Sequence, residues 1–367
     1  MKVLYYTNIP APYRVKFFNQ LSKYVDLTVL FNGDRSESYR NKEWFKNNNF
    51  EFEFINLKKF ALFQLNKLLN ENNYDVVIIG TYANMNGAIL NILLRHKNIK
   101  FFLNADGGVV PKKETFISKY LKTKFISTAS YYLSTGKTTN EYLLNYKARL
   151  EDIYIYPLSS IEKSDVLLLP MKMEEKLKLR KSAGYNYKRL FISVGSFIER
   201  KGYDLFLNSL LINNNERNGY IIIGGGEEKE DYEDFLKEHN IKNVHFIDFC
   251  DKEKVFEYYK MSDVFFFPSR EDIWGLVINE AMSCGLPVIA TFETASAREV
   301  FKKSQLYQCD NIRALSKKIN EYSLKSALDL YKEGLNNLEI SSKYTIENMV
   351  DKHLKIFEEV KKREKEN

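Results

Sequence analysis

The chain has 367 residues, of which 44% are hydrophobic and 28% charged, and its apolar runs are all shorter than the roughly 18 residues of a membrane span. This composition is typical of a soluble globular protein, argues against a transmembrane helix, and allows two domains with separate cores. The formal net charge is +7, and residues 1–160 carry 22 Lys and Arg against 13 Asp and Glu, so the basic excess lies in the N-terminal half and favours an anionic partner.

Strand and helix patterns alternate along both halves. The first residues predict a buried strand rather than a signal peptide. Continuous apolar runs predict buried parallel strands at residues 2–6, 27–31, 51–55, 76–80, 101–103, 131–134 and 153–156 in the first half. The second half has equivalent runs at residues 190–194, 220–223, 244–247, 264–267 and 288–290. Helical patterns separate them, for example at residues 13–22, 203–211 and 231–239. Repeated strand–helix units predict two doubly wound α/β domains.

The domain boundary is predicted between Ser159 and Lys188, where a Pro-Leu-Ser-Ser step is followed by a charged helical pattern at residues 173–181. We assign residues 1–163 to an N-terminal domain, 164–344 to a C-terminal domain and 345–367 to a final helix. Cys250, Cys284 and Cys309 are scattered and odd in number, which favours reduced thiols in a cytoplasm.

Two loops of the first half carry polar residues. Tyr13 and Arg14 open a predicted helix after the first strand, where Arg14 could bind an anionic ligand or lie on the surface. Asp106 and Gly107 follow the strand at residues 101–103, and Asp106 could bind a ligand or cap a turn.

The segment at residues 112–126 is basic and aromatic, and residues 58–63 have a similar character. Basic helices with an aromatic face can lie on anionic membranes, or they can simply cover a core. Both interpretations remain open on sequence grounds.

Glycine loops follow two strands of the second half. Gly195 lets the backbone approach a ligand closely, and Arg200 and Lys201 add fixed positive charge one short loop later. Gly225 lies in a Gly-Gly-Gly-Glu step after the strand at residues 220–223, a weak signal on its own. Together these loops favour a phosphorylated ligand.

The most informative segment is residues 268–289, which leaves an apolar strand, makes an acidic turn and enters a short helix through Gly275. Asp272 in the turn and Glu280 about two turns into the helix could both face a cleft at the carboxyl end of a parallel strand, where open α/β sheets bind ligands. Carboxylates accept hydrogen bonds from hydroxyl groups, and the amides of a helix N-terminus bind phosphate oxygens.

This segment resembles the donor-binding signature of family 4 glycosyltransferases, which are retaining enzymes of the GT-B fold. The resemblance implies two Rossmann-like domains facing across a cleft, with the final helix crossing back to the N-terminal domain; a plain surface helix is the alternative. Three positions depart from the family pattern. Asp272 stands where most members have Glu, Ser196 where many have Arg, and Asp106 where many have His.

The resemblance also implies roles for individual residues. Glu280 would bind the two ribose hydroxyls of a nucleotide, and Phe249 and Asp248 would hold the nucleobase. Asp272 and the backbone of the helix start would hold the transferred sugar and the diphosphate. The full set of donor-binding candidates is Gly195, Ser196, Arg200, Lys201, Gly225, Asp248, Phe249, Asp272, Ile273, Trp274, Gly275, Leu276 and Glu280. Trp274 could equally be a packing residue.

Catalysis or charge stabilisation is assigned to Asp106 and to three of the donor-binding candidates, Lys201, Arg200 and Asp272. The acceptor side is assigned to Arg14, Tyr13 and Gly107. An Asp-x-Asp motif is missing from the sequence, so we expect no metal and no cofactor. Positive side chains and helix N-termini would stabilise the leaving diphosphate instead.

The function expected is transfer of a sugar from a UDP- or GDP-sugar to an acceptor hydroxyl, on a saccharide or lipid-linked intermediate of a surface polysaccharide. The abundance of Asn, Lys, Ile and Tyr suggests a bacterial source, with the protein cytoplasmic or peripheral on the inner membrane face. The alternatives are a nucleotide-sugar epimerase, a phosphorylase-like enzyme, or a non-enzymatic anionic-ligand binder. A nicotinamide oxidoreductase is disfavoured because residues 7–14 contain no glycine. Nucleic-acid binding would leave Asp272 and Glu280 unexplained.

Overall fold

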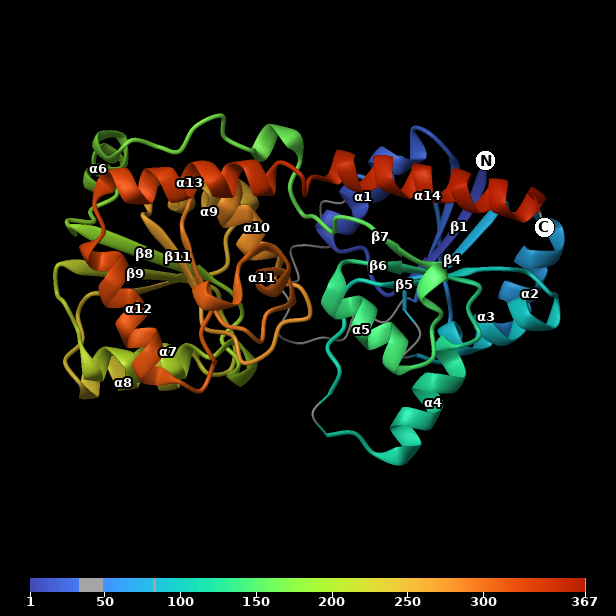
Figure 1. Ribbon diagram of the computed structural model, residues 1–367, viewed down its shortest axis with the longest axis horizontal. Coiled ribbons are helices and arrows are strands. Elements are labelled where there is room, and N and C mark those ends of the chain that lie inside the picture. The colour runs from blue at the N-terminus through green and yellow to red at the C-terminus, as the bar shows by residue number, and fades with distance from the viewer. Residues whose placement is uncertain (33–48, 82–83, 112, 367) are drawn as a thin grey trace. The chain divides into compact units, whose positions relative to one another are not determined.

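The computed structural model describes residues 1–32, 49–81, 84–111 and 113–366. Within these ranges the chain forms two compact units (Figure 1). Unit 1 contains the described residues up to 159 together with residues 346–366, and unit 2 contains residues 160–345. Lys112, the first residue of the basic segment predicted at 112–126, lies outside the described residues.

Unit 1 is built on a parallel sheet whose described strands have the spatial order β3-β2-β1-β4-β5-β6-β7. The first strand lies inside the sheet and the chain winds outward from it in both directions, as predicted for a doubly wound domain. Val3, Leu4, Tyr5 and Tyr6 are fully buried because helices cover both faces. The strands are β1 (Lys2–Thr7), β2 (Asp26–Phe31), β3 (Glu53–Asn56), β4 (Val76–Ile79), β5 (Phe102–Ala105), β6 (Tyr131–Ser134) and β7 (Ile153–Ile155).

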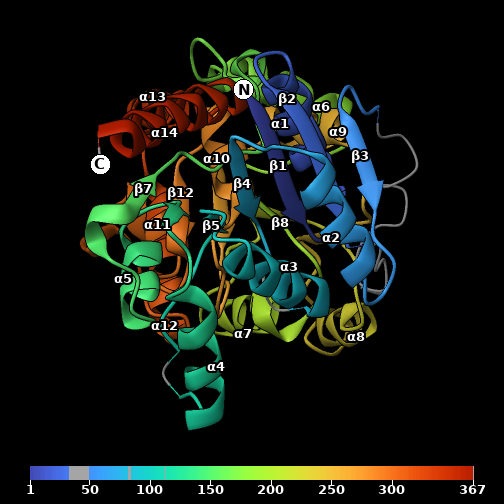
Figure 2. The same cartoon turned by 90° about the vertical axis from the view of Figure 1, so that its right-hand side faces the viewer.

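Helices lie on both faces of the unit 1 sheet (Figure 2). Tyr6 and Leu103 share a core cluster with side chains of α2 (Leu62–Glu71), α3 (Met85–His96), α4 (Phe116–Ile126) and α5 (Lys137–Asn145). The other face is covered by α1 (Pro12–Ser22) and α14 (Ile346–Glu366), which contact each other. A short 3-10 helix, η2 (Leu150–Asp152), precedes β7.

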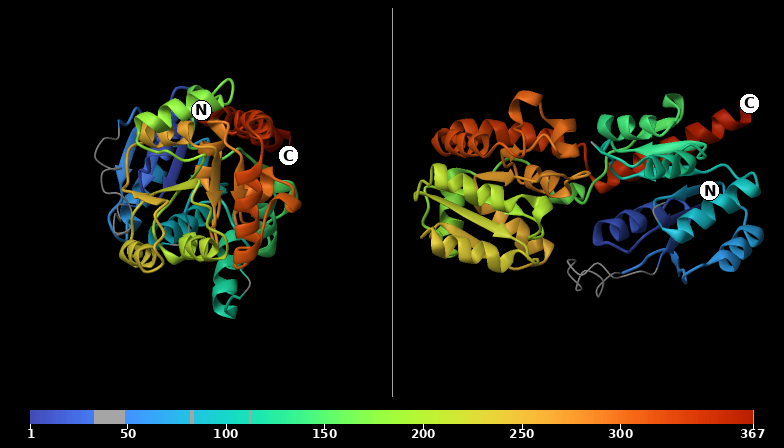
Figure 3. Two further views of the ribbon diagram at one scale, coloured as in Figure 1. Left: turned by 90° about the vertical axis from the view of Figure 1, so that its left-hand side faces the viewer. Right: turned by 90° about the horizontal axis from the view of Figure 1, so that it is seen from below.

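Unit 2 contains a second parallel sheet (Figure 3). Its described strands have the order β10-β9-β8-β11-β12. The strands are β8 (Arg189–Val194), β9 (Asn218–Ile223), β10 (Val244–Ile247), β11 (Val264–Phe267) and β12 (Val288–Ala290). All four residues of β11 are fully buried, which explains why this strand is continuously apolar.

Helices cover both faces of the unit 2 sheet as well. Side chains of α7 (Tyr203–Ile212), α8 (Lys229–Glu238) and α12 (Ile312–Leu324) pack on one face, and those of α9 (Lys252–Met261), α10 (Leu276–Ser283) and α11 (Ala295–Val300) pack on the other. α13 (Ala327–Ser341) contacts α10, and α6 (Met173–Ser182) contacts α9. The 3-10 helices are η3 (Lys163–Asp165), η4 (Glu199–Lys201) and η5 (Lys303–Gln305).

The predicted fold class is confirmed. Each strand expected from the sequence overlaps an observed strand, with ends that differ by at most two residues. Continuous apolar runs were sufficient because these strands are buried on both faces, so hydrophobicity alone marks them.

Candidate functional site

Three loops of unit 2 meet at the carboxyl ends of β8, β9 and β11. The Phe197 N–H, after β8, donates to the Gly225 carbonyl, after β9, over 2.9 Å. The Arg270 N–H, after β11, donates to the Arg200 carbonyl over 2.9 Å. The predicted glycine loops and the acidic turn therefore belong to one place in the structure, and backbone hydrogen bonds fix their spacing.

Two glycines make this close approach possible. Gly202 has φ +69°, and a Cβ on it would collide with the Pro268 carbonyl of the acidic turn. A Cβ on Gly224 would collide with the carbonyl of Gly195. Because neither neighbour is a flexible side chain, a larger residue at either position would separate the loops.

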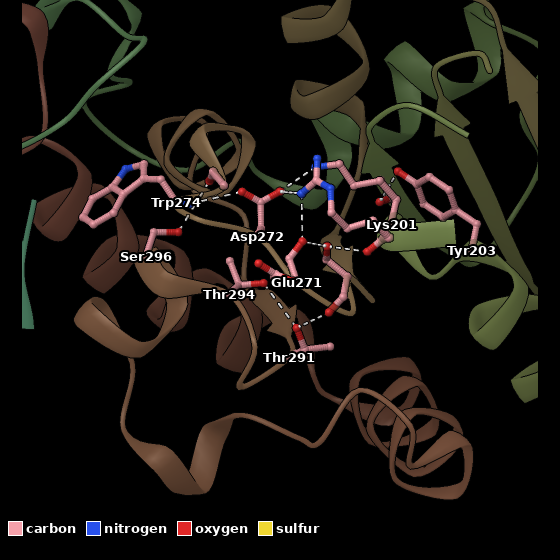
Figure 4. Close-up of polar contacts among 12 residues, drawn as sticks. Lys201, Tyr203, Glu271, Asp272, Trp274, Thr291, Thr294 and Ser296 are labelled. Carbon is pink, nitrogen blue, oxygen red and sulfur yellow. Dashed lines mark hydrogen bonds and ion pairs between the residues drawn. The ribbon is translucent and has the colours of Figure 1, made fainter. Parts of the chain in front are cut away.

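Asp272 lies at the centre of the site, where its side chain faces two cations (Figure 4). Lys201 donates from Nζ to Oδ2 over 2.6 Å, and Arg200 Nη1 lies 3.4 Å from the same oxygen. The Trp274 N–H donates to Oδ1 over 3.2 Å. The Asp272 carboxylate is therefore held in one orientation by three donors.

The same surroundings keep Asp272 ionised. The residue is only 7% exposed, and burial by itself opposes a charged carboxylate. The positive charges of Lys201 and Arg200 outweigh that burial and hold the pKa of Asp272 below its ordinary value. At neutral pH the site thus contains a fixed negative charge between two positive ones.

A second segment, residues 291–295, holds the backbone of the acidic turn in place (Figure 4). Asp272 forms a parallel bridge with Thr294, and the Ala295 N–H donates to the Asp272 carbonyl over 3.0 Å. The Thr291 hydroxyl donates to the Ser269 carbonyl over 2.7 Å. The backbone of the turn is therefore positioned independently of any ligand.

Lys201 is held along its whole length. Its Nζ lies 4.8 Å from the ring centroid of Phe267, and its aliphatic carbons pass beside Gly195. The Lys201 side chain is 13% exposed, whereas that of Arg200 is 44% exposed. Arg200 is consequently the more accessible of the two cations.

Glu280 occupies α10, whose N-cap is Gly275. The helix begins at Leu276, so Glu280 lies slightly more than one turn from its start and not the two turns expected. Its side chain is partly buried, and Oε1 accepts a hydrogen bond from the Ser160 hydroxyl over 2.6 Å. Burial raises the pKa of Glu280, while the Ser160 hydrogen bond lowers it. The Glu280 carboxylate therefore already has a hydrogen-bond partner within the protein.

The two candidates for holding a nucleobase differ in their environment. Phe249 is partly buried, and the edge of its ring lies next to the position that a Cβ on Gly225 would occupy. Asp248 has a side chain that is 80% exposed, and its Oδ1 accepts from Lys229 Nζ over 2.5 Å. Phe249 is thus fixed by packing, and Asp248 is a surface residue with a basic partner.

The remaining predicted residues of unit 2 lie around the turn. Ser196 is partly buried and Ile273 is exposed. Trp274 is 4% exposed, with its ring 6.2 Å from that of Tyr344. Burial supports the packing interpretation of the Trp274 side chain, while its backbone N–H serves Asp272.

Unit 1 places Arg14 and Asp106 in direct contact. Arg14 is 2% exposed, and its guanidinium forms an ion pair with the Asp106 carboxylate. Asp106 Oδ1 also accepts from the Tyr156 hydroxyl over 2.7 Å and from Asn104 Nδ2 over 2.6 Å. The surface alternative for Arg14 is therefore wrong, and its charge serves Asp106.

Tyr13 and Gly107 flank this pair. Tyr13 is partly exposed, with its ring centroid 5.5 Å from the Arg14 guanidinium carbon. Gly107 follows Asp106 and is partly exposed. Both are accessible at the carboxyl end of the unit 1 sheet.

Sequence reasoning missed several contributors to these two places. Each is distant in sequence from its partner, so only the fold brings the two together. Tyr156 donates a hydrogen bond to Asp106, Ser160 to Glu280 and Lys229 to Asp248. Asp204 accepts from the Arg270 guanidinium through both carboxylate oxygens. The Pro-Leu-Ser-Ser step containing Ser160 was interpreted only as a domain boundary.

The described residues contain no group of three or more His, Cys, Asp or Glu side chains placed to hold a metal ion. Nor does any helix in the described part of the chain have the length and apolar character needed to cross a bilayer.

The loops described above fall within a known family model. Residues 174–334 match the model described as "Glycosyl transferases group 1", and this range includes Lys201, Asp272 and Glu280.

Curated relatives match over shorter segments. The chain is 34% identical over 100 residues to an O-antigen biosynthesis glycosyltransferase, WclY, of Escherichia coli, which covers 27% of each protein. It is 26% identical over 187 residues to an alpha-galactosylglucosyldiacylglycerol synthase of Streptococcus pneumoniae, covering 44% of this chain and 50% of the relative. The matched segments thus span between about a quarter and a half of these relatives.

Solved structures match over almost the entire chain. The HepE protein of Anabaena, crystallised with UDP and glucose, superimposes with a TM-score of 0.76 over 98% of this chain and 99% of its own, at 15% identity. Likeness at this identity shows the fold, and the GT-B fold expected from the sequence is confirmed.

Proposed function

We propose that this chain, which belongs to the glycosyl transferases group 1 family, is a retaining glycosyltransferase. The donor is a nucleoside diphosphate sugar carrying UDP or GDP, and the product is a glycoside formed on an acceptor hydroxyl. The observation that supports this most directly is the Asp272 turn, with its two cations, next to the N-terminus of α10.

The cations and the helix N-terminus suit a diphosphate leaving group. Arg200 is accessible, and Lys201 is locked beside Gly195, so both charges are fixed before the donor binds. Gly275 provides no side-chain cap for α10, which leaves amides of its first turn for phosphate oxygens. Asp272, which is ionised, would accept hydrogen bonds from hydroxyls of the transferred sugar.

Glu280 and the Phe249 loop suit the nucleoside. A partly buried carboxylate steadied by Ser160 has oxygen lone pairs to bind the two ribose hydroxyls. Phe249 offers a ring face or edge for the base, and Asp248 or its backbone offers polar contacts to the base edge.

On the acceptor side we propose Asp106, Tyr13 and Gly107, with Asp106 stabilising positive charge near the anomeric carbon or holding a hydroxyl. The donor phosphate itself would assist deprotonation of the acceptor, so no carboxylate pair of the glycosidase type is needed. We propose further that neither a metal nor a cofactor takes part. Treatment with EDTA should therefore leave the transfer rate unchanged.

For the acceptor we propose a saccharide or lipid-linked intermediate of a surface polysaccharide, used in a bacterial cytoplasm or at the inner membrane face. The names of two relatives, an O-antigen glycosyltransferase and a glycosyldiacylglycerol synthase, support this class of acceptor.

The test combines binding and turnover. UDP or GDP at about 100 times its dissociation constant should stabilise the protein by about 2.7 kcal/mol, seen as a rise in Tm. UDP- and GDP-sugars should then be hydrolysed or transferred with retention of the anomeric configuration, followed by NMR. The proposal fails if no nucleotide raises Tm and no nucleotide sugar is consumed.

Glu280→Ala sharpens this test. It should abolish the rise in Tm with UDP or GDP, whereas Ser160→Ala should retain it, because Ser160 only steadies the carboxylate. Equal behaviour of the two variants would remove Glu280 from the nucleotide site.

A further inference from the structure

The α4 helix of unit 1 presents an apolar face to solvent. Phe116, Ile117, Tyr120 and Leu121 are 84%, 71%, 52% and 61% exposed. Their spacing of i, i+1, i+4 and i+5 places all four on one side of the helix. A contiguous group of large exposed apolar side chains is uncommon on a protein surface and usually marks a binding face.

The opposite side and the C-terminal end of α4 attach it to unit 1. Ile126 is fully buried, and Phe125 packs against the same core cluster. Lys122 forms an ion pair with Glu114 at 2.7 Å, and the Glu114 carboxylate also accepts from the hydroxyl of Tyr146, which follows α5, over 2.8 Å. Figures 1 and 2 show α4 projecting from the rest of unit 1. The exposed face is therefore on a firmly attached helix and is not a frayed segment.

Positive charge surrounds this face. Lys113, Lys119 and Lys124 are exposed, and α4 itself contains no Asp or Glu. Lys124 follows Tyr120 by one turn, with its Nζ 5.6 Å from the tyrosine ring centroid. Its aliphatic stem thus extends the apolar face, and its charge lies at the edge of that face.

We propose that α4 docks on the surface of an anionic phospholipid bilayer. Apolar side chains flanked by lysines match the two parts of such a surface, since the apolar groups enter the acyl boundary and the ammonium groups meet the phosphates. A protein partner fits less well because lysine is depleted from protein–protein interfaces. This inference is independent of the proposed reaction.

The test is co-sedimentation of the full chain with lipid vesicles at 150 mM NaCl. Vesicles containing 30% phosphatidylglycerol should bind the protein, and vesicles of phosphatidylcholine alone should bind it at least tenfold more weakly. Phe116→Ser with Leu121→Ser should reduce binding to anionic vesicles at least tenfold. Lys119→Glu with Lys124→Glu should reduce it more than 25-fold, because each lysine near the surface accounts for about fivefold.

Matched control variants come from unit 2. Leu324→Ser with Leu328→Ser removes two side chains of similar exposure, and Lys178→Glu with Lys181→Glu reverses two exposed charges on α6. Both controls should bind vesicles like the parent. The Tm of every variant is measured with and without UDP. A cooperative transition shows that the variant is folded, and an unchanged shift with UDP shows that a loss of vesicle binding does not come from damage to the donor site.

Insertion can be seen directly with Tyr120→Trp, whose added fluorescence should shift to the blue and be quenched by brominated lipid. Leu324→Trp should show neither effect. Absence of vesicle binding by the parent, or equal losses in the α4 and control variants, would overturn the proposal. The proposal would also be overturned if the parent formed a concentration-dependent dimer but did not bind vesicles, and if Phe116→Ser with Leu121→Ser abolished that dimer. The α4 face would then bind a second copy of the chain.

Discussion

Asp272 in unit 2 and Asp106 in unit 1 both follow a buried parallel strand, and both are paired with an arginine or lysine. Their supports differ. Asp272 is held by loop residues, with Arg200 nearly half exposed and Lys201 beside a glycine. Asp106 is held by Arg14, which is buried against Tyr5, and by the hydroxyl of Tyr156 at the end of β7. One cluster leaves the Arg200 cation accessible to solvent, whereas the other buries its cation against a carboxylate.

The largest effect that we expect concerns the loop cluster. Lys201→Ala should lower kcat about 100-fold or more, because it removes a preorganised charge from the leaving diphosphate. The acid limb of the pH–rate profile should also move to higher pH, since Lys201 helps to keep the pKa of Asp272 low. Steady-state rates of UDP or GDP release measure both. Lys178→Ala, at an exposed position of α6, is the control, and a rate for Lys201→Ala near that of the control would contradict the assignment.

Arg14→Ala tests the buried cluster through stability. Breaking the ion pair should cost about 3 kcal/mol of unfolding free energy, at the low end for buried pairs because the Asp106 side chain is 25% exposed. Arg200→Ala should change stability by no more than about 0.5 kcal/mol, because its side chain reaches solvent. Urea unfolding compares the two. Similar losses in both variants would remove the distinction between the clusters.

His353, on α14, gives unit 1 a pH dependence of stability between pH 7 and 5, a range in which Asp272 of the loop cluster stays ionised. Its ring lies 4.5 Å from that of Tyr156, and burial lowers its pKa to about 4. Because the unfolded chain binds a proton near pH 6.5 and the folded chain does not, stability is complete above that pH and falls between pH 6.5 and 4. The loss between pH 7 and 5 should be about 2 kcal/mol.

Urea unfolding at the two pH values measures this loss. His353→Leu should remove it, and His239→Gln, at an exposed position, should leave it unchanged. An undiminished pH dependence in His353→Leu would assign the effect to other groups.

The smallest effect is expected at Asp248. Its carboxylate is exposed and paired with Lys229 on the surface, so Asp248→Ala should weaken UDP binding less than about fivefold. Phe249→Ala, which removes a packed ring, should weaken it more. Calorimetric titration with UDP ranks the two, and the reverse order would give Asp248 the leading role in holding the base.

The same contrast explains how much the sequence could predict. The strands and the Asp272 turn were identified because burial on both faces and short-range glycine spacing leave a local signal. The pairing of Arg14 with Asp106 was missed because the two residues are 92 positions apart and meet only through the order of the strands. Ser160 meets Glu280 across 120 positions in the same way. Neither pairing has a local pattern from which it could be derived.

The position of α14 has a practical consequence for dissecting this molecule. Residues 346–366 complete the fold around α1, and the rings of Phe17 and Tyr156 both pack against His353 of this segment. In the sequence, the whole of unit 2 lies between this segment and the rest of unit 1. A fragment ending at residue 159 would leave those rings bare and should precipitate. Supplying the last 22 residues as a separate peptide should rescue it, so the N-terminal half is best studied by complementation from two pieces.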